Sequence, residues 1–249
     1  MTSIIINGAL GFMGRVIADT VKKNDDLEVV CGFDIKQDEA SMFPVYSSPD
    51  DFKGSADVII DFSHPSSFDG ILKYAVDTKT PIVFATTGLS DEQKAKMKEA
   101  SAKTAIFYSA NMSLGISVIT ALAKRAAEIL GKDFDIEIIE KHHHRKLDAP
   151  SGTALAIAEE LNENDDFEFV YDRHSVRKAR DPKEIGIHSV RGGTIVGEHT
   201  VLFAGNDEVI EIKHSANSRE IFATGAIAAA RFLKGKPSGM YSMKDIVKI

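Results

Sequence analysis

The chain has 249 residues, a formal net charge of −7 and a sequence pI of about 5.6. This acidic balance, without a basic stripe along the chain, argues against a general nucleic-acid or membrane-surface binder. The sequence shows no secretory signal and no apolar run that could span a bilayer, and a single cysteine excludes an internal disulfide. We therefore expect a cytoplasmic protein, with Cys31 packed as a small apolar residue inside a strand.

The first residues form a candidate dinucleotide site. An apolar strand over 3–7 leads into Gly8-Ala9-Leu10-Gly11-Phe12-Met13-Gly14, and a helical pattern follows. In a dinucleotide fold the three glycines make the tight turn, admit the pyrophosphate and let the helix pack on the strand. The next strand, over 27–33, ends at Asp34, whose carboxylate suits the two ribose hydroxyls of an adenosine. The alternative is a glycine-rich helix entry that binds nothing.

The residues after that second strand bear on the choice of cofactor. The Asp34 carboxylate repels the 2′-phosphate of NADP, and Ile35 places no positive charge beside it, although Lys36 partly compensates. We therefore expect NADH to be favoured, with NADPH as the second possibility.

Strands and helices alternate as far as residue 108. Strands are predicted over 56–62, 81–85 and 105–108, and helices over 66–76 and from a capping box at Ser90 to about Lys103. This order predicts a parallel sheet with right-handed crossovers, in which ligands lie beyond the carboxyl ends of the strands. The loops expected to face the cofactor contain Ala85, Thr86, Thr87, Ser109, Ala110, Asn111 and Met112.

A dense basic cluster stands between a strand and a helix in the second half of the chain. Residues 134–139 alternate apolar and acidic residues and predict a strand, which runs into E-K-H-H-H-R-K-L-D-A-P-S-G-T-A over 140–154. Pro150 suits the first turn of a helix, and the small residues after it leave backbone N–H groups accessible to an anion. The cluster and the helix entry together predict a ligand with more than one negative group.

A metal site, a solvated loop and an oligomer contact are three other interpretations of this cluster. Neighbours on an extended segment point to opposite sides, so His142 and His144 share a face that His143 does not, and no spaced Cys or carboxylate supports a metal. A solvated charge run does not need the helix entry that follows. In a nicotinamide fold, a His or Lys here supplies the proton that accompanies hydride transfer.

The remaining segments predict a second, strand-rich domain and a closing helix. A helix is predicted over 115–130 and another over 219–233, which packs back on the nucleotide domain, and the strands between them cover 167–171, 185–190, 193–203 and 208–214. Tight turns between consecutive strands indicate a mixed, largely antiparallel sheet, which invites a homo-oligomer through one face.

We therefore predict an α/β protein of two domains. A Rossmann-like, parallel-sheet nucleotide domain is expected over 1–113 and 217–249, which makes it discontinuous. An α+β domain for substrate binding and oligomerisation is expected over 114–216.

The basic cluster also carries a family signature. The run over 140–154 resembles E-x-H-H-x-x-K-x-D-x-P-S-G-T-A of the 4-hydroxy-tetrahydrodipicolinate reductase (dihydrodipicolinate reductase) family, and residues 8–14, 85–88 and 196–200 have counterparts in order. The resemblance implies NADH- or NADPH-dependent reduction of 4-hydroxy-tetrahydrodipicolinate to tetrahydrodipicolinate, with loss of water, in lysine and diaminopimelate biosynthesis. It also implies a homotetramer.

The signature assigns a role to each matching residue. His142 matches the family's proton donor and acceptor, and Lys146 matches its second acid. His143, Gly152 and Thr153 match the residues that hold the carboxylates of the small dicarboxylate substrate, a role that the helix entry suggests independently for the last two.

The chain departs from the family pattern at three positions. Phe12 stands where many members have Arg, and Ile35 stands where NADPH-using members have Arg, so both weaken the case for NADPH. Ala85 replaces a usual glycine, a small change that we expect to be tolerated. The alternatives to this function are another two-domain nicotinamide dehydrogenase and a nucleotide sensor without turnover.

Overall fold

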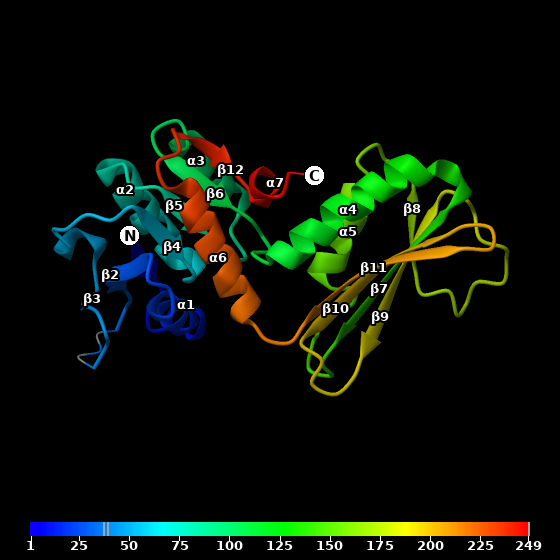
Figure 1. Cartoon of the computed structure of the whole chain (residues 1–249), viewed down its shortest axis with the longest axis horizontal. Helices are drawn as coiled ribbons and strands as arrows, with labels where there is room; N and C mark the ends of the chain where they lie inside the picture. Colours follow the sequence, from blue (N-terminus) through cyan, green and yellow to red (C-terminus); the bar gives the residue numbers. More distant parts are fainter. Residues whose placement is uncertain (37, 39, 249) are drawn as a thin grey trace. The chain divides into compact units, whose positions relative to one another are not determined.

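The computed structural model describes residues 1–36, 38 and 40–248, which form two compact units (Figure 1). The first unit comprises Met1–Leu114 and Glu220–Lys248, and the second comprises Gly115–Arg219. The predicted range 217–249 thus includes one position, 249, that lies outside the described residues. Each unit has its own hydrophobic core.

A seven-stranded sheet forms the centre of the first unit, and all six pairs of neighbouring strands in it are parallel. The predicted Rossmann-like nucleotide fold is therefore confirmed. Two short edge strands, β3 and β12, were not predicted, because two or three residues are too few to show a periodic pattern. In sheet order the strands are β12 (Gly239–Tyr241), β6 (Ala105–Tyr108), β5 (Ile82–Phe84), β4 (Val58–Asp61), β1 (Thr2–Asn7), β2 (Leu27–Phe33) and β3 (Val45–Tyr46).

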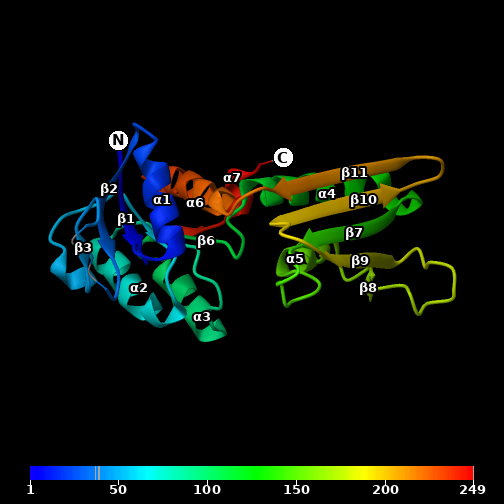
Figure 2. The same ribbon diagram turned by 90° about the horizontal axis from the view of Figure 1, so that it is seen from below.

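Helices cover both faces of this sheet, as Figure 2 shows. One face packs against α1 (Phe12–Lys22), α6 (Glu220–Leu233) and α7 (Met243–Ile246), and the other against α2 (Phe68–Thr78) and α3 (Asp91–Ala100). Successive strand residues point to opposite faces, so Ile4 and Ile5 join different cores. Cys31 is fully buried, as expected, and burial raises the pKa of its thiol to about 12.

The second unit is built on a five-stranded sheet, which confirms the predicted α+β fold and mixed sheet. The expectation that this sheet is largely antiparallel was wrong, because the long connection over 172–183 returns β9 parallel to β8, and two of the four strand pairs are parallel. Strand β10 is antiparallel to both β7 and β11, whereas β9 is parallel to both β7 and β8. The strand expected from residue 193 begins at Gly197, because residues 193–194 form a turn and Gly193 has a φ of +50°. In sheet order the strands are β11 (Val209–Ala216), β10 (Gly197–Ala204), β7 (Asp135–His142), β9 (Glu184–Arg191) and β8 (Glu168–Tyr171).

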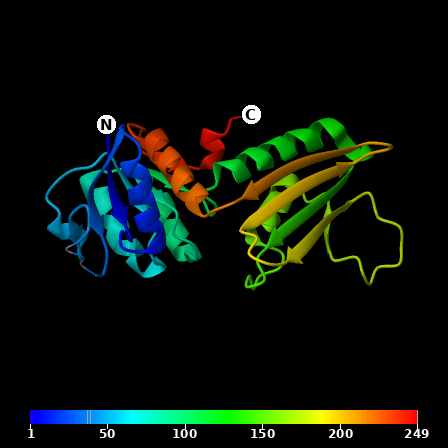
Figure 3. The same ribbon diagram turned by 60° about the horizontal axis from the view of Figure 1, so that its bottom comes forward.

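Helices α4 (Leu114–Leu130) and α5 (Gly152–Leu161) cover one face of this second sheet (Figure 3). The expectation that Pro150 occupies the first helical turn was wrong, because α5 begins two residues later. The hydroxyl of Ser151 accepts the Ala154 N–H at 3.2 Å and makes Ser151 the N-cap. Short 3₁₀ helices lie at Pro49–Asp51, Pro65–Ser67 and Gly131–Asp133.

Candidate active site

The tight turn after β1 depends on glycines for its shape. Gly8 has a φ of +81°, and a Cβ there would lie 2.7 Å from the Phe62 carbonyl oxygen. A Cβ at Gly14 would lie 2.2 Å from the Gly8 carbonyl oxygen, so α1 packs directly on the turn. Gly11 is the N-cap of α1 and provides no side-chain cap. The first N–H groups of α1 are therefore suited to bind an anion.

Asp34 follows β2 and ties the end of that strand to the glycine turn. Its carboxylate accepts the Leu10 N–H at 2.9 Å and the Lys36 N–H at 3.3 Å. Phe12 and Ile35 are 65% and 90% exposed, and neither carries a charge that could pair with a 2′-phosphate. Of the other predicted loop residues, Ala9 is buried and Met13 is half-buried.

A buried carboxylate that sequence reasoning missed connects the strand ends of the first unit. Asp61 is 1% exposed and accepts hydrogen bonds from Asn7 at 2.7 Å and from the hydroxyl of Thr86 at 2.7 Å. The Ser63 hydroxyl is a third donor, at 2.5 Å. Burial raises the pKa of Asp61, although these hydrogen bonds oppose the increase. The side chain of Thr86 is thus turned inward, whereas Thr87 and Gly88 of the same loop are exposed.

The loop after β6 is held by its own hydrogen bonds. The Ser109 hydroxyl donates to the Asn111 carbonyl at 2.7 Å, and the Asn111 side chain accepts the Ser113 N–H at 2.9 Å. Met112 is 3% exposed and its side chain joins the core, as does that of Ala85. At these two positions only the backbone is available to a ligand, whereas Ala110 is exposed.

In the second unit, the end of β7 presents a fully buried glutamate beside His142. Glu140 Oε2 lies 2.5 Å from His142 Nδ1, and both oxygens accept from Arg191, at 2.6 and 2.9 Å. The backbone N–H of Ser151 donates to Oε1 at 3.1 Å. Burial raises the pKa of Glu140, but the hydrogen bonds from Arg191 and others outweigh it and hold the pKa at about 2. Glu140 is therefore ionised at neutral pH.

A second histidine packs against His142. His199 on β10 pairs with Glu140 in the sheet register, and its ring centroid lies 5.2 Å from that of His142, with the planes at 74°. His199 Nε2 lies 3.1 Å from the Ser151 hydroxyl. Burial lowers the pKa of His199 to about 4, so the ring is neutral at pH 7.

The segment between β7 and α5 holds the other predicted substrate residues. Lys146 Nζ lies 2.9 Å from Asp148 Oδ1, and this bond and a weaker one from the Gly152 N–H lower the pKa of Asp148. Partial burial and then the charge of Arg145 lower the pKa of His143. Gly152 is exposed at the first position of α5 and Thr153 is half-buried, whereas His144 and Arg145 are exposed.

Four residues of this site were missed as participants: Glu140, Ser151, Arg191 and His199. Glu140 belongs to the family signature, but its partner Arg191 is 51 residues away in sequence. Only the pairing of β7 with β9 brings them together, because it sets His142 opposite Arg191.

Among the described residues, no group of three or more His, Cys, Asp or Glu side chains is placed to hold a metal ion. In the same residues, no helix is long and apolar enough to cross a membrane.

Both halves of the chain match models of one protein family. Residues 2–112 match the family described as dihydrodipicolinate reductase, N-terminus, and residues 115–247 match dihydrodipicolinate reductase, C-terminus. The chain belongs to the dihydrodipicolinate reductase family. Family relatives named 4-hydroxy-tetrahydrodipicolinate reductase include one from Caldanaerobacter subterraneus subsp. tengcongensis, 52% identical over 100% of this chain and 99% of the relative.

Further comparisons agree with that family. A relative of the same name from Clostridium tetani is 48% identical over 98% of this chain and 96% of its own length. A solved structure, a dipicolinate-bound dihydrodipicolinate reductase from Paenisporosarcina sp. TG-14, superposes with a TM-score of 0.85 at 26% identity. The match covers 99% of this chain and 100% of that one.

Proposed function

We propose that the protein reduces 4-hydroxy-tetrahydrodipicolinate to tetrahydrodipicolinate, with NADH or NADPH as reductant, in lysine and diaminopimelate biosynthesis. The substrate gains one hydride and one proton and loses one water. The observation that carries the proposal is His142, a histidine bonded to a buried ionised glutamate and followed within the same loop by Lys146 and the start of α5. Family membership over the full chain supports it.

The first unit is proposed to hold the nicotinamide cofactor, which supplies the hydride when bound. The glycine turn and the first N–H groups of α1 bind the pyrophosphate, and Asp34 accepts from the adenosine ribose. We expect NADH to be preferred, because the exposed Phe12 and Ile35 give a 2′-phosphate no cationic partner. The loops at 85–87 and 109–112 complete the site through their backbone groups.

The second unit is proposed to hold the dicarboxylate. His143, Gly152 and Thr153 bind its carboxylates, and the N-terminus of α5 favours negative charge there. Lys146, now bonded to Asp148, becomes the second acid when a substrate carboxylate replaces Asp148 at the Gly152 N–H. His142 gives the proton that accompanies hydride transfer, a contribution of about 10²–10⁴-fold for a well-placed general acid.

We also propose that the protein is a cytoplasmic homotetramer. The face of the second sheet opposite α4 and α5 includes Val209, which is 59% exposed, and Leu202, which is half-buried. This face also carries the charged partners of Glu137, and a sheet face that lies away from its own helices is a natural contact between identical subunits. Light scattering on the purified protein measures the oligomer size directly.

A coupled assay tests the reaction. Substrate is made in the cuvette by a synthase from pyruvate and aspartate semialdehyde, and oxidation of NADH and of NADPH is followed separately. We expect consumption of both, with kcat/KM for NADH at least equal to that for NADPH. Binding of NADH without consumption of either cofactor would instead identify a nucleotide sensor, and the same assay without synthase controls for direct oxidation.

A further inference from the structure

Glu140 stands directly behind the proposed proton donor. We propose that Glu140 is a positioning residue that keeps His142 in a single tautomer, with the proton on Nδ1, so that Nε2 alone exchanges a proton with the substrate. The geometry of β7, β9 and α5 supports the tautomer of His142, and only the role of Nε2 in proton exchange rests on the proposed function.

The hydrogen bonds of Glu140 require that the neighbouring ring nitrogen of His142, Nδ1, carries a hydrogen. A carboxylate can only accept, and the donors around this one are two N–H groups of Arg191, the Ser151 N–H, the Ser189 hydroxyl and His142 Nδ1. Arg191 and the backbone N–H are donors in every state, so the negative charge stays on Glu140. His142 must therefore carry hydrogen on Nδ1 to make its bond of 2.5 Å.

Nε2, the other ring nitrogen of His142, remains available for proton transfer. Within the described part of the chain Nε2 has no hydrogen-bond partner, and a Cβ added at Gly197 would lie 3.1 Å from it. Glycine at 197 thus keeps the space beside Nε2 open. The neutral His199 ring packs against the His142 ring in an edge-to-face contact, which favours one orientation of the His142 plane.

This arrangement gives a balanced proton transfer. The imidazolium form of His142 carries hydrogen on both nitrogens, and the bond from Nε2 to hydrogen breaks as a bond from substrate to hydrogen forms. The electron pair of the broken bond remains on Nε2, and the ring becomes neutral with its proton on Nδ1. Glu140 stabilises both forms of the ring through the same hydrogen bond, so no rotation or tautomer exchange is needed between turnovers.

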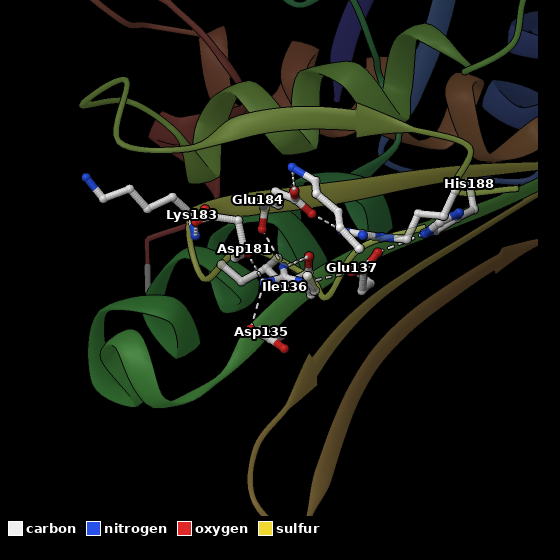
Figure 4. Close-up of polar contacts among 10 residues, drawn as sticks. Asp135, Ile136, Glu137, Asp181, Lys183, Glu184 and His188 are labelled. Carbon is white, nitrogen blue, oxygen red and sulfur yellow. Dashed lines mark hydrogen bonds and ion pairs between the residues drawn. The ribbon is translucent and has the colours of Figure 1, made fainter. Parts of the chain in front are cut away.

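The same strand supplies a matched control. Glu137 also binds one arginine and one histidine, with Arg180 Nε at 3.0 Å and His188 Nε2 at 2.8 Å, but it does not contact His142 (Figure 4). Glu137→Gln therefore removes the same charge, from the same strand and from the same kinds of partner.

The test is the tautomer of His142, read from nitrogen chemical shifts of ¹⁵N-histidine-labelled protein at a pH where the ring is neutral. The His142→Gln variant identifies the His142 signals. We expect hydrogen on Nδ1 in the wild type and in Glu137→Gln. Glu140→Gln should populate hydrogen on Nε2, because one carboxylate oxygen becomes an NH₂ donor, and its kcat should fall about 10²-fold or more with unchanged affinity for NADH.

Two results would overturn the proposal. One is a wild-type ring with hydrogen on Nε2, a measurement that needs no folded variant at position 140. The other is a Glu140→Gln protein that retains both the wild-type tautomer and the wild-type kcat. A wild type with hydrogen on Nδ1 that turns over no substrate would support the positioning role and contradict the proposed reaction, so the two failures are distinguishable.

Discussion

Strand β7 carries two glutamates that each bind an arginine and a histidine, and only one of the two glutamates is fully buried. The side chain of Glu140 is 0% exposed and that of Glu137 is 19% exposed. The two glutamates project to opposite faces of the sheet, because their positions differ by an odd number of residues. The partners are Arg191 and His142 for Glu140, and Arg180 and His188 for Glu137.

The two sets contain the same residue types, so their different roles come from the residues that surround them. Around Glu140 the helix entry of α5 adds a backbone donor and the proposed anion site. Around Glu137 the arginine instead ties down a loop, since Arg180 also bonds Asp135 and the carbonyls of Ile136 and Glu184 (Figure 4). The set around the fully buried Glu140 is suited to proton transfer, and the set around the half-buried Glu137 to holding the segment before β9.

The largest difference in stability is expected when each arginine is removed. Arg191→Met leaves the ionised Glu140 buried without its main partner, which typically costs about 3–5 kcal/mol. Arg180→Met should cost less, about 1–3 kcal/mol, because water can reach Glu137 and Asp135. Urea unfolding of both variants measures the difference. An equal loss for the two would contradict the distinction between a fully buried and a half-buried glutamate.

Much of this molecule could be predicted from sequence because its signals are local. The glycine turn, Asp34 at the end of its strand and the run from His142 to Thr153 each lie within a few residues of the chain. The Glu140–Arg191 pair could not be found in this way, since it depends on strand register across 51 residues. Asp61 was missed for a similar reason, because its three donors come from three different strand ends.

A smaller effect is expected in the pH dependence of stability. Burial holds the pKa of His199 at about 4, below its ordinary 6.5, so the unfolded chain takes up this proton at a higher pH than the folded one. Wild-type stability should therefore fall as the pH drops from 6.5 towards 4. In His199→Gln the free energy of unfolding should fall less over the same pH range, because the titrating ring is absent.

The charged and titratable groups that act on His199 are His142, Glu140, His214 and Lys146, and all of them are retained in His199→Gln. The free energy of unfolding of the variant and the wild type, measured by urea at several pH values, isolates the contribution of position 199. Parallel curves between pH 6.5 and 4 would show that His199 is not held neutral.

The most direct test of the central claim compares two histidines on the two faces of the second sheet. kcat is measured for His142→Gln and His188→Gln with freshly generated substrate and NADH, and light scattering checks that both variants keep the wild-type assembly. We predict a fall of about 10²–10⁴-fold for His142→Gln and a wild-type rate for His188→Gln. Wild-type turnover by His142→Gln, or an equal loss in both variants, would contradict this prediction.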